Sequence, residues 1–455
     1  MSKATVSTVK TADSEIPYAK FGSGEKIFVL LPGLYAKSLM PLADAVASQY
    51  RRFTTEYTVY FFDRVAAPPQ GYSLQDMAAD TISVMDKLSL RDCYVLGISA
   101  GGIVAQIIAA KRPDLVQKLA VASSAAKESA ESKKNFEEWI SLAKAHKGAA
   151  LNESFAKNVY TDTFYRQYRD AILASLDGAT DEDMDRFAIF ASSLLGLDIT
   201  GETALISCPL LAFGAAQDKI FGQKAAKDIA EKSRGKFSVY EGYGHAVYDE
   251  APDFLDRVIA FFSEPVLLYV NSCVRPTSRT DELARCLLEK KEGMYVQEVN
   301  LQKEQITGLD LEALKRRDEC AAKGRLDDEI FSYARNFARA DEIVISAPYW
   351  DLLFPASIRA YIERICVVGL TFAYTESGMP KSLCRAKKLT YVTTAGGFIG
   401  DRHLGFEYIK TIANVFFGIE DVDIIKAEGL DIAGADVNTI MKEAKNRMCK
   451  TDLKK

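Results

Sequence analysis

The chain of 455 residues is longer than one ordinary hydrophobic core supports, so two or three domains are expected. Hydrophobic residues make up 48% of the sequence and charged residues 26%, a balance typical of a well-folded soluble protein. The net charge of -5, and the lack of an uninterrupted apolar run of membrane-spanning length, give no reason to expect nucleic acid or a membrane as a partner.

The first elements alternate between strands and helices. Apolar runs predict strands at residues 26–31 and 57–62. Ser73 has capping-box spacing to Asp76 and opens a helix that runs to about residue 88. Such alternation predicts a mostly parallel sheet covered on both faces, with chemistry at the carboxyl ends of its strands.

The next strand runs straight into Gly97-Ile98-Ser99-Ala100-Gly101 and a helix. This is a G-x-S-x-G turn in the strand–turn–helix context that exposes a nucleophilic serine. The glycines keep side chains away from a tight turn, and the backbone N–H of Ala100 is placed where an oxyanion would develop. A structural Gly-Ser-Gly turn is the alternative.

Helical spacing of apolar residues replaces the strand pattern from about residue 126 to residue 200. The sheet then resumes with a strand at residues 209–215, which is followed by Asp218. A last strand at residues 237–240 precedes His245 in a Gly-rich loop. Serine, acid and histidine thus each follow a strand, in the order Ser, Asp, His.

These contexts resemble the α/β-hydrolase superfamily over residues 20–263. The resemblance implies a domain over residues 1–264 with a helical cap at about 126–200. It also implies Ser99 as nucleophile, His245 as general base and acid, and Asp218 as the group that orients the imidazole. The backbone N–H groups of Leu34 and Ala100 would form the oxyanion hole. Nucleophilic acyl transfer is then expected, and a binding module with a relic triad is the rival interpretation.

A second α/β pattern begins at Pro265. Strands are predicted at residues 266–270, 295–299, 342–346, 388–392 and 422–425, with helices between them and a last helix at about 435–448. We therefore expect a five-stranded parallel α/β domain over residues 265–455.

The loop from residue 272 to residue 280 has the composition of a phosphate cradle. It offers hydroxyl groups, arginine and backbone N–H groups ahead of a helix N-terminus, whose dipole favours an anion. It matches neither a G-x-G-x-x-G nor a Walker sequence, and an ordinary polar β–α loop is equally compatible with it.

Two further loops, residues 346–355 and 393–397, together with the segment 369–374, resemble flavodoxin-like quinone reductases and FMN-dependent azoreductases. The resemblance implies FMN, NADH or NADPH as co-substrate, and a homodimer formed through this domain. The residues that would hold the FMN phosphate are Ser272, Ser278, Arg279 and Thr280. Those that would line the isoalloxazine ring are Pro348, Tyr349, Trp350, Asp351, Leu352, Thr394, Ala395, Gly396 and Gly397. The family often has Asn in place of Asp351 and Arg in place of Ala395.

Cysteine and histidine usage bears on location and metal binding. The eight cysteines are scattered without a C-x-x-C pair, which favours buried thiols in a reducing cytoplasm over disulfides or zinc. No metal site is expected. Of the three histidines, His146 lies in a Lys-rich helical stretch and is expected at the surface.

The sequence as a whole predicts a bifunctional enzyme with small-molecule substrates. One half would be a serine hydrolase acting on an ester, thioester, lactone or activated C–C bond. The other would be an FMN-dependent NAD(P)H oxidoreductase reducing quinone- or azo-type acceptors. In the alternative interpretation, the second domain serves only as an electron carrier or a dimerisation module.

Overall fold

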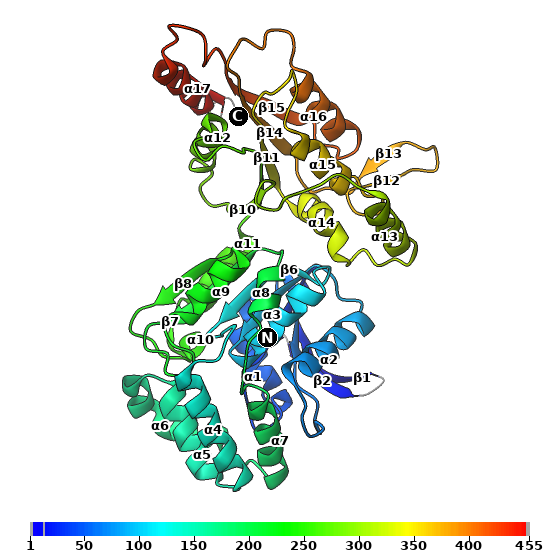
Figure 1. Cartoon of the computed structure of the whole chain (residues 1–455). Helices are drawn as coiled ribbons and strands as arrows, with labels where there is room; N and C mark the ends of the chain where they lie inside the picture. Colours follow the sequence, from blue (N-terminus) through cyan, green and yellow to red (C-terminus); the bar gives the residue numbers. More distant parts are fainter. Residues whose placement is uncertain (1–2, 12–13, 452–455) are drawn as a thin grey trace. The chain divides into compact units, whose positions relative to one another are not determined.

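The computed structural model describes residues 3–11 and 14–451, with side chains through residue 448. The chain divides into two compact units, Met1–Ser263 and Glu264–Lys455 (Figure 1). The division follows helix α11 (Phe254–Ser263), one residue before the position expected from the sequence. Each unit has its own sheet and its own hydrophobic clusters.

The first unit is built on an eight-stranded sheet in the order β1-β2-β4-β3-β5-β6-β7-β8. Strands β1 and β2 form an antiparallel hairpin that joins β4 at one edge, and the other strands are parallel. The hairpin was not predicted. The strands are β1 (Thr5–Lys10), β2 (Glu15–Phe21), β3 (Lys26–Leu31), β4 (Tyr57–Phe62), β5 (Cys93–Ile98), β6 (Val116–Ala122), β7 (Leu210–Ala215) and β8 (Lys236–Tyr240).

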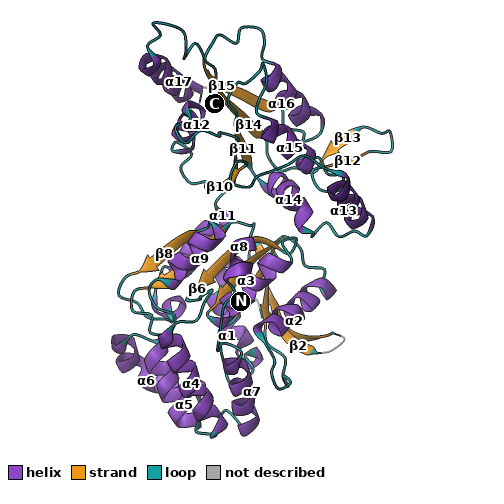
Figure 2. Ribbon diagram, in the orientation of Figure 1, coloured by secondary structure: helices purple, strands orange, loops and turns teal. Residues whose placement is uncertain are grey.

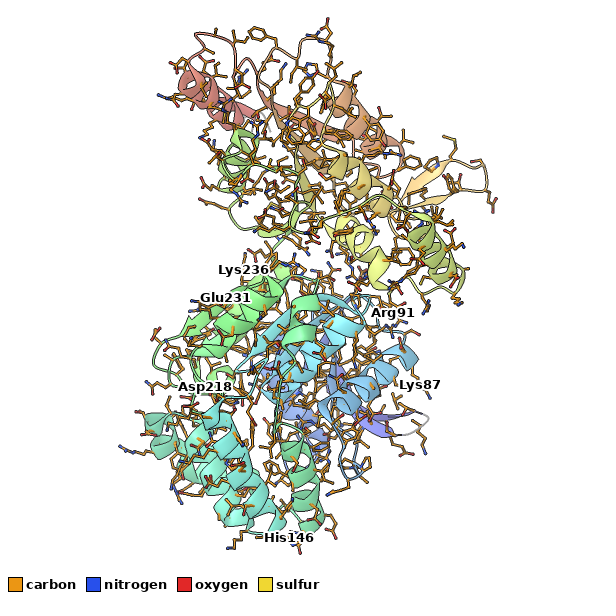
Figure 3. The ribbon with its side chains drawn as sticks, viewed as in Figure 1. Lys87, Arg91, His146, Asp218, Glu231 and Lys236 are labelled. Carbon is orange, nitrogen blue, oxygen red and sulfur yellow. The ribbon has the colours of Figure 1, made fainter. Side chains whose placement is uncertain are left out.

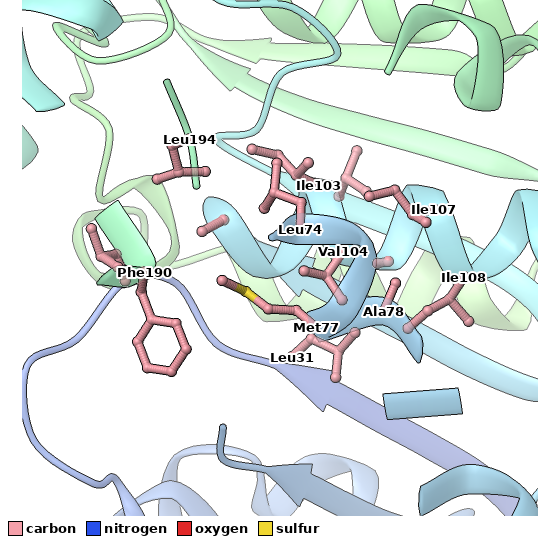
Figure 4. Close-up of a cluster of buried hydrophobic side chains, with 14 of the residues drawn as sticks. Leu31, Leu74, Met77, Ala78, Ile103, Val104, Ile107, Ile108, Phe190 and Leu194 are labelled. Carbon is pink, nitrogen blue, oxygen red and sulfur yellow. The ribbon is translucent and has the colours of Figure 1, made fainter. Parts of the chain in front are cut away.

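Helices cover both faces of this sheet because its central strands are apolar on both sides (Figure 2). On one face Phe28 of β3 packs against Phe53 and Phe262, with ring centroids 4.8 and 5.5 Å apart. On the other face Leu31 of β3 packs against α2 (Leu74–Lys87) and α3 (Ala100–Lys111), as the close-up in Figure 4 shows. The remaining helices of the sheet layer are α1 (Ala43–Gln49), α8 (Thr200–Leu205), α9 (Ala225–Ser233) and α10 (Val247–Glu250).

Four helices between β6 and α8 form the cap. They are α4 (Ala130–Lys144), α5 (Gly148–Val159), α6 (Asp162–Leu176) and α7 (Asp181–Ser192), and α4 packs on α5 and α7. Trp139 of α4 is buried between Phe136 and Phe155, and its indole donates to Ser154 Oγ at 3.2 Å. The two ends of the cap segment pair with each other, because Glu128 N–H donates to Leu197 and Ile199 N–H donates to Ala126.

The second unit contains a five-stranded parallel sheet in the order β10-β9-β11-β14-β15. This is the 2-1-3-4-5 order of flavodoxin-like folds, whose ligands bind where the order reverses, between the first and third strands. Here those strands are β9 and β11. The bounds are β9 (Val266–Asn271), β10 (Tyr295–Asn300), β11 (Glu342–Ser346), β14 (Lys388–Thr394) and β15 (Asp421–Ala427).

Successive residues of β9 point to opposite faces of this sheet. Leu268 and Val270 pack with α14 (Ser332–Arg339), α15 (Ala356–Ile365) and α16 (Leu404–Val415). Leu267 and Tyr269 pack with α12 (Arg279–Leu288) and α17 (Val437–Thr451). Both faces are thus covered, and the loops at the carboxyl ends of the strands are left for a ligand. The unit also contains α13 (Leu311–Ala322) and a small hairpin, β12 (Phe372–Tyr374) and β13 (Pro380–Ser382).

Within the described residues, no helix is long and apolar enough to cross a membrane. The same residues contain no cluster of three or more His, Cys, Asp or Glu side chains suited to a metal ion. Seven cysteines are thiols in the structure, and the side chain of the eighth, Cys449, lies outside the described part of the chain.

Candidate active sites

The turn between β5 and α3 holds Ser99 in a strained backbone conformation. Ser99 has φ 52° and ψ -121°, a region that residues other than glycine rarely adopt. A Cβ at Gly101 would lie 2.3 Å from the carbonyl oxygen of Leu31, and one at Gly97 would lie 2.6 Å from that of Gly101. The two glycines are therefore required by close backbone approach, and the turn they permit projects the serine hydroxyl from the end of the sheet.

Ser99, His245 and Asp218 form one hydrogen-bonded chain. His245 Nε2 lies 2.9 Å from Ser99 Oγ, and His245 Nδ1 lies 3.0 Å from each oxygen of the Asp218 carboxylate. Asp218 follows β7, and His245 lies in the loop after β8. The structure thus brings together the three residues that the sequence order predicted as a triad.

The acid and the imidazole are shielded from solvent. Asp218 is 9% exposed and His245 is 3% exposed, and the ring of Phe221 packs 5.6 Å from the imidazole. Asp218 Oδ1 also accepts from the backbone N–H groups of Ile220 and Phe221, at 2.7 and 3.1 Å. These bonds fix the carboxylate, so it can hold the imidazole in one tautomer and stabilise the imidazolium when Nε2 takes the serine proton.

The two predicted oxyanion donors lie on either side of the serine. Ala100 is the first residue of α3, where N–H groups have no partner within the helix. Leu34 follows Gly33, and a Cβ on Gly33 would lie 3.3 Å from Ser99 Cβ, so this loop passes directly beside Ser99. Within the described residues, neither N–H has a hydrogen-bond acceptor.

Two arginines near the loop that carries Gly33 and Leu34 were not predicted as part of the site. Arg64 donates to the carbonyl oxygens of Pro32 and Gly33, and Arg186 of cap helix α7 donates to those of Arg64 and Val65. Desolvation lowers the pKa of Arg64 to about 10, so the guanidinium remains protonated at neutral pH. The sequence position of Arg64, directly after a strand, could have marked it as a candidate site residue. Arg186 lies within a helical segment, and nothing in that segment distinguished it.

A second carboxyl group close to the site was also missed. Asp249 accepts from the phenol of Tyr160 at 3.2 Å. Desolvation raises the pKa of Asp249 to about 6. Desolvation, and then the charge of Asp249, also raises the pKa of Tyr35, which follows the predicted oxyanion donor Leu34.

His146 takes no part in this arrangement. It lies at the tip of the cap, remote from Asp218 (Figure 3). Its Nε2 is 2.9 Å from Asp185 Oδ1, and this hydrogen bond raises the pKa of His146. His146 is thus a partly exposed residue in a surface ion pair, as expected.

In the second unit, the predicted phosphate loop is tied to the ends of β9 and β11. Ser272 donates to the carbonyl oxygen of Ser346 at 2.8 Å and is buried, so its hydroxyl proton is used internally. Ser278 is the N-cap of α12 and accepts from Asp281 N–H at 3.3 Å. Thr280 Oγ1 lies 2.6 Å from Thr394 Oγ1, and this contact joins the first turn of α12 to the end of β14.

Arg279 is engaged by an acid that the sequence did not single out. Its Nη1 donates to Asp431 Oδ1 at 2.8 Å, and Asp431 N–H donates to the carbonyl oxygen of Gly396 at 2.9 Å. A Cβ at Gly396 would lie 2.4 Å from Asp431 Oδ2. Gly396 therefore packs closely against the side chain of Asp431 in the loop after β15, and Arg279 faces a carboxylate in this structure.

The loop after β11 forms a tight two-residue hairpin. Trp350 and Leu353 exchange backbone hydrogen bonds of 3.0 and 2.7 Å, and Asp351 and Leu352 between them have φ values of 51° and 68°. These are the values of a type I′ turn, which Asn and Asp tolerate better than Leu. The turn leaves Trp350 39% exposed and Leu352 48% exposed, while Tyr349 N–H is bonded to Thr394 O at 3.0 Å.

The two glycines after β14 differ in their surroundings. Nothing lies within 4 Å of a Cβ built on Gly397, in contrast to the tight packing at Gly396. Ala395 is buried and its N–H donates to Ala427 at 2.9 Å. Pro348 precedes Tyr349 in the neighbouring loop. The predicted residues on the loops after β9, β11 and β14 are thus gathered at one end of the sheet, with open space at Gly397.

Comparison with protein families identifies the two units separately. The alpha/beta hydrolase fold family matches residues 26–252. The flavodoxin-like fold family matches residues 266–451. The order of the two families along the chain is the one expected from the sequence.

The second unit is similar to FMN-dependent NADH:quinone oxidoreductases. It is 37% identical over 187 residues to FMN-dependent NADH:quinone oxidoreductase 2 of Clostridium acetobutylicum, a match that covers 39% of this chain and 92% of that protein. It is 34% identical over 189 residues to the FMN-dependent NADH:quinone oxidoreductase of Lachnoclostridium phytofermentans, which covers 40% of this chain and 94% of that protein.

The first unit resembles solved structures of the hydrolase fold. An alpha/beta hydrolase enzyme from a Medee basin deep-sea metagenome library aligns with a TM-score of 0.51 at 20% identity, over 60% of this chain and 100% of that one. The enol-lactonase of Burkholderia xenovorans LB400 aligns with a TM-score of 0.51 at 18% identity, over 57% and 100%. The chain therefore joins a domain of the alpha/beta hydrolase fold to a flavodoxin-like domain that belongs to the family of FMN-dependent NADH:quinone oxidoreductases.

Proposed function

We propose that the chain is a bifunctional enzyme, a serine hydrolase joined to an FMN-dependent NADH oxidoreductase. The observation that carries the hydrolase half is the hydrogen-bonded chain Ser99–His245–Asp218 at the carboxyl ends of three parallel strands. The observation that carries the oxidoreductase half is the set of loops gathered at the β9/β11 switch point in a unit similar to flavin enzymes.

In the hydrolase half, Ser99 Oγ attacks the substrate carbonyl carbon while His245 Nε2 takes its proton. The Leu34 and Ala100 N–H groups stabilise the oxyanion. His245 then gives the proton to the leaving group, and water releases the acyl group by the same steps in reverse. The substrate that we propose carries an ester, a thioester, a lactone or an activated C–C bond.

Covalent labelling tests this half. A fluorophosphonate probe reacts with a serine only when a base and an oxyanion hole activate it. The parent and the Ser48→Ala variant, whose serine lies exposed on α1, are expected to label equally. The Ser99→Ala variant is expected to lose the label, and an unlabelled parent contradicts the proposal.

In the oxidoreductase half, the residues fit a phosphate and a flat ring. Ser278 and the N-terminus of the ten-residue helix α12 supply polar groups for the FMN phosphate. The open space at Gly397 admits a flat ring, which Tyr349 and Trp350 would border. Arg279 would contact the phosphate only by leaving Asp431. The chemistry that FMN supplies when bound is the transfer of two electrons from a nicotinamide to an acceptor, and we propose NADH as donor and quinone- or azo-type compounds as acceptors.

The purified full chain tests this half. It is expected to be yellow, or to bind added FMN, and to oxidise NADH when 1,4-benzoquinone is supplied, with NADPH measured in parallel. A colourless chain that takes up no FMN contradicts the flavoenzyme proposal. In that case the remaining interpretation is that the second unit serves only as a dimerisation module. A yellow chain that oxidises neither nicotinamide when the quinone is present supports an electron carrier instead.

We also propose that this unit forms a homodimer around the flavin loops. Apolar side chains at the carboxyl end of its sheet are exposed to an unusual degree, including Phe398 at 67% and Leu404 at 55%. Analytical ultracentrifugation should show a dimer that Phe398→Glu weakens, and a monomeric parent contradicts this point. We also propose a reducing, cytoplasmic location, because the eight cysteines are scattered along the sequence without a C-x-x-C pair.

A further inference from the structure

Arg64 contacts the oxyanion loop, which we define as residues 32–34, and it is not a member of the triad. It follows β4, and its Nη2 donates to the carbonyl oxygen of Pro32 at 3.0 Å and to that of Gly33. The guanidinium therefore holds two successive carbonyl groups of the loop that passes beside Ser99. A single charged side chain thus holds this stretch of backbone.

The geometry of one peptide group gives this contact a consequence for catalysis. The carbonyl of Gly33 and the N–H of Leu34 belong to the same planar peptide, so in the trans form they point in opposite directions. Holding the Gly33 oxygen thus fixes the direction of the Leu34 N–H. A hydrogen bond from a charged donor also polarises the peptide, which makes its N–H a stronger donor.

We propose that Arg64 is a positioning residue that aims and polarises the Leu34 N–H toward the oxyanion formed at Ser99. This inference rests on the proposed serine hydrolase function and adds a residue to it. Arg64 does not touch the substrate. It acts through the Gly33–Leu34 peptide, and its removal reduces the stabilisation of the transition state more than it reduces substrate affinity.

A second layer of contacts ties this arginine to the cap. Arg186 of α7 donates to the carbonyl oxygens of Arg64 at 3.2 Å and of Ala36 at 3.4 Å, so it touches both segments that border the oxyanion loop. Asp63 Oδ1 accepts from Arg64 N–H at 2.7 Å and from Arg186 Nη2 at 3.4 Å. Both guanidinium groups lie over the ring of Phe190, at 5.3 and 5.1 Å. The cap thereby holds Arg64 in place.

The test separates positioning from a merely structural role. Hydrolysis of p-nitrophenyl acetate gives kcat and KM, and a trifluoromethyl ketone gives the affinity for a tetrahedral adduct on Ser99. The full-length chain is compared with Arg64→Met, Arg64→Lys and the control Arg52→Met, whose arginine forms an exposed ion pair with Asp256. Emission from the buried Trp139, read in a Trp350→Phe background, shows whether the first unit is folded.

Arg64→Met is expected to lower kcat by about 100-fold, the effect of losing one oxyanion donor, and to weaken ketone binding by the same factor. KM should stay within about 2-fold, and Arg52→Met should match the parent. Arg64→Lys should recover part of the loss, because a lysine keeps the charge and one donor.

Unchanged kcat and ketone affinity in Arg64→Met overturn the inference alone. If Arg64→Met loses native Trp139 emission, the test is made on Arg64→Lys instead. A loss of ketone affinity in Arg64→Lys that is proportional to its loss of kcat supports the inference. A kcat and a ketone affinity equal to those of the parent overturn it. A parent that neither hydrolyses the ester nor binds the ketone overturns the proposed hydrolase function, and the inference falls with it.

Discussion

Nε2 of His245 lies 2.9 Å from Oγ of Ser99, although 146 residues separate the two along the chain. The contact exists because both residues follow strands of the same sheet and emerge at the carboxyl ends of parallel strands. The strained φ of Ser99 points its hydroxyl toward the imidazole instead of into the helix that follows. The fold therefore holds the two side chains in hydrogen-bonding distance.

The first prediction concerns Asp218. Asp218→Asn should lower kcat by roughly 10⁴-fold with little change in KM, because an amide holds the imidazole in the wrong tautomer. The variant should fold, since an Asn oxygen still accepts from Ile220 and Phe221 N–H. Steady-state hydrolysis of p-nitrophenyl acetate measures the loss. Asp253→Asn, which removes an exposed acid paired with Arg257, is the matched control and should keep parental kcat.

The second prediction concerns the tight turn. Gly101→Ala should destabilise the first unit by about 3 kcal/mol, because the new Cβ meets the Leu31 carbonyl. Gly201→Ala in α8 has open space around its Cβ and should change stability by no more than about 1 kcal/mol. Urea unfolding is followed by Trp139 in a Trp350→Phe background, so that the signal comes from the first unit. Equal midpoints for the two variants would show that the turn does not need its glycine.

The third prediction concerns the proposed flavin site. Gly397→Leu should reduce FMN affinity by at least about 100-fold while the unit stays folded, because the side chain fills the open space where the ring is proposed to lie. FMN fluorescence titration measures the affinity. Gly308→Leu, at an exposed glycine of the same unit, should bind FMN as the parent does. Parental affinity in Gly397→Leu would place the flavin elsewhere.

The fourth prediction concerns pH. Desolvation in the fold raises the pKa of Asp249 from its ordinary value of 3.8 to about 6, so the folded state binds this proton more tightly than the unfolded chain does. The parent therefore loses stability relative to Asp249→Asn as the pH rises from about 4 to about 6, and the difference is constant above that. Thermal unfolding monitored by Trp139 in the Trp350→Phe background, from pH 4 to pH 8, measures the difference. A difference that does not change with pH contradicts the raised pKa.

The sequence was most informative where strands are buried. The predicted ranges 26–31, 57–62 and 342–346 coincide with β3, β4 and β11, since strands buried on both faces are continuous apolar runs. The hairpin of β1 and β2 was missed because β1 is an edge strand with mostly exposed and many polar side chains. The β12–β13 hairpin was missed for a similar reason, because each of its strands has three residues.

The site residues likewise fall into those that the sequence predicted and those that it did not. Ser99, Asp218 and His245 were recognisable because each follows a strand, and the topology alone brings strand ends together. The contacts of Arg186 with Asp63 and of Arg279 with Asp431 span 123 and 152 residues. Each joins an arginine on a helix to an aspartate on a loop, and no sequence periodicity fixes such a pairing. Such pairs depend on tertiary packing, which residue spacing does not encode.

Native mass spectrometry of the full chain after reaction with a fluorophosphonate tests the central claim most directly. The account predicts one phosphonate adduct per polypeptide, mapped to Ser99 by peptide sequencing, on the same molecules that carry one non-covalently bound FMN. A chain that gains no adduct, gains it on another serine, or cannot be loaded with FMN would contradict the claim that two separate active centres occupy this polypeptide.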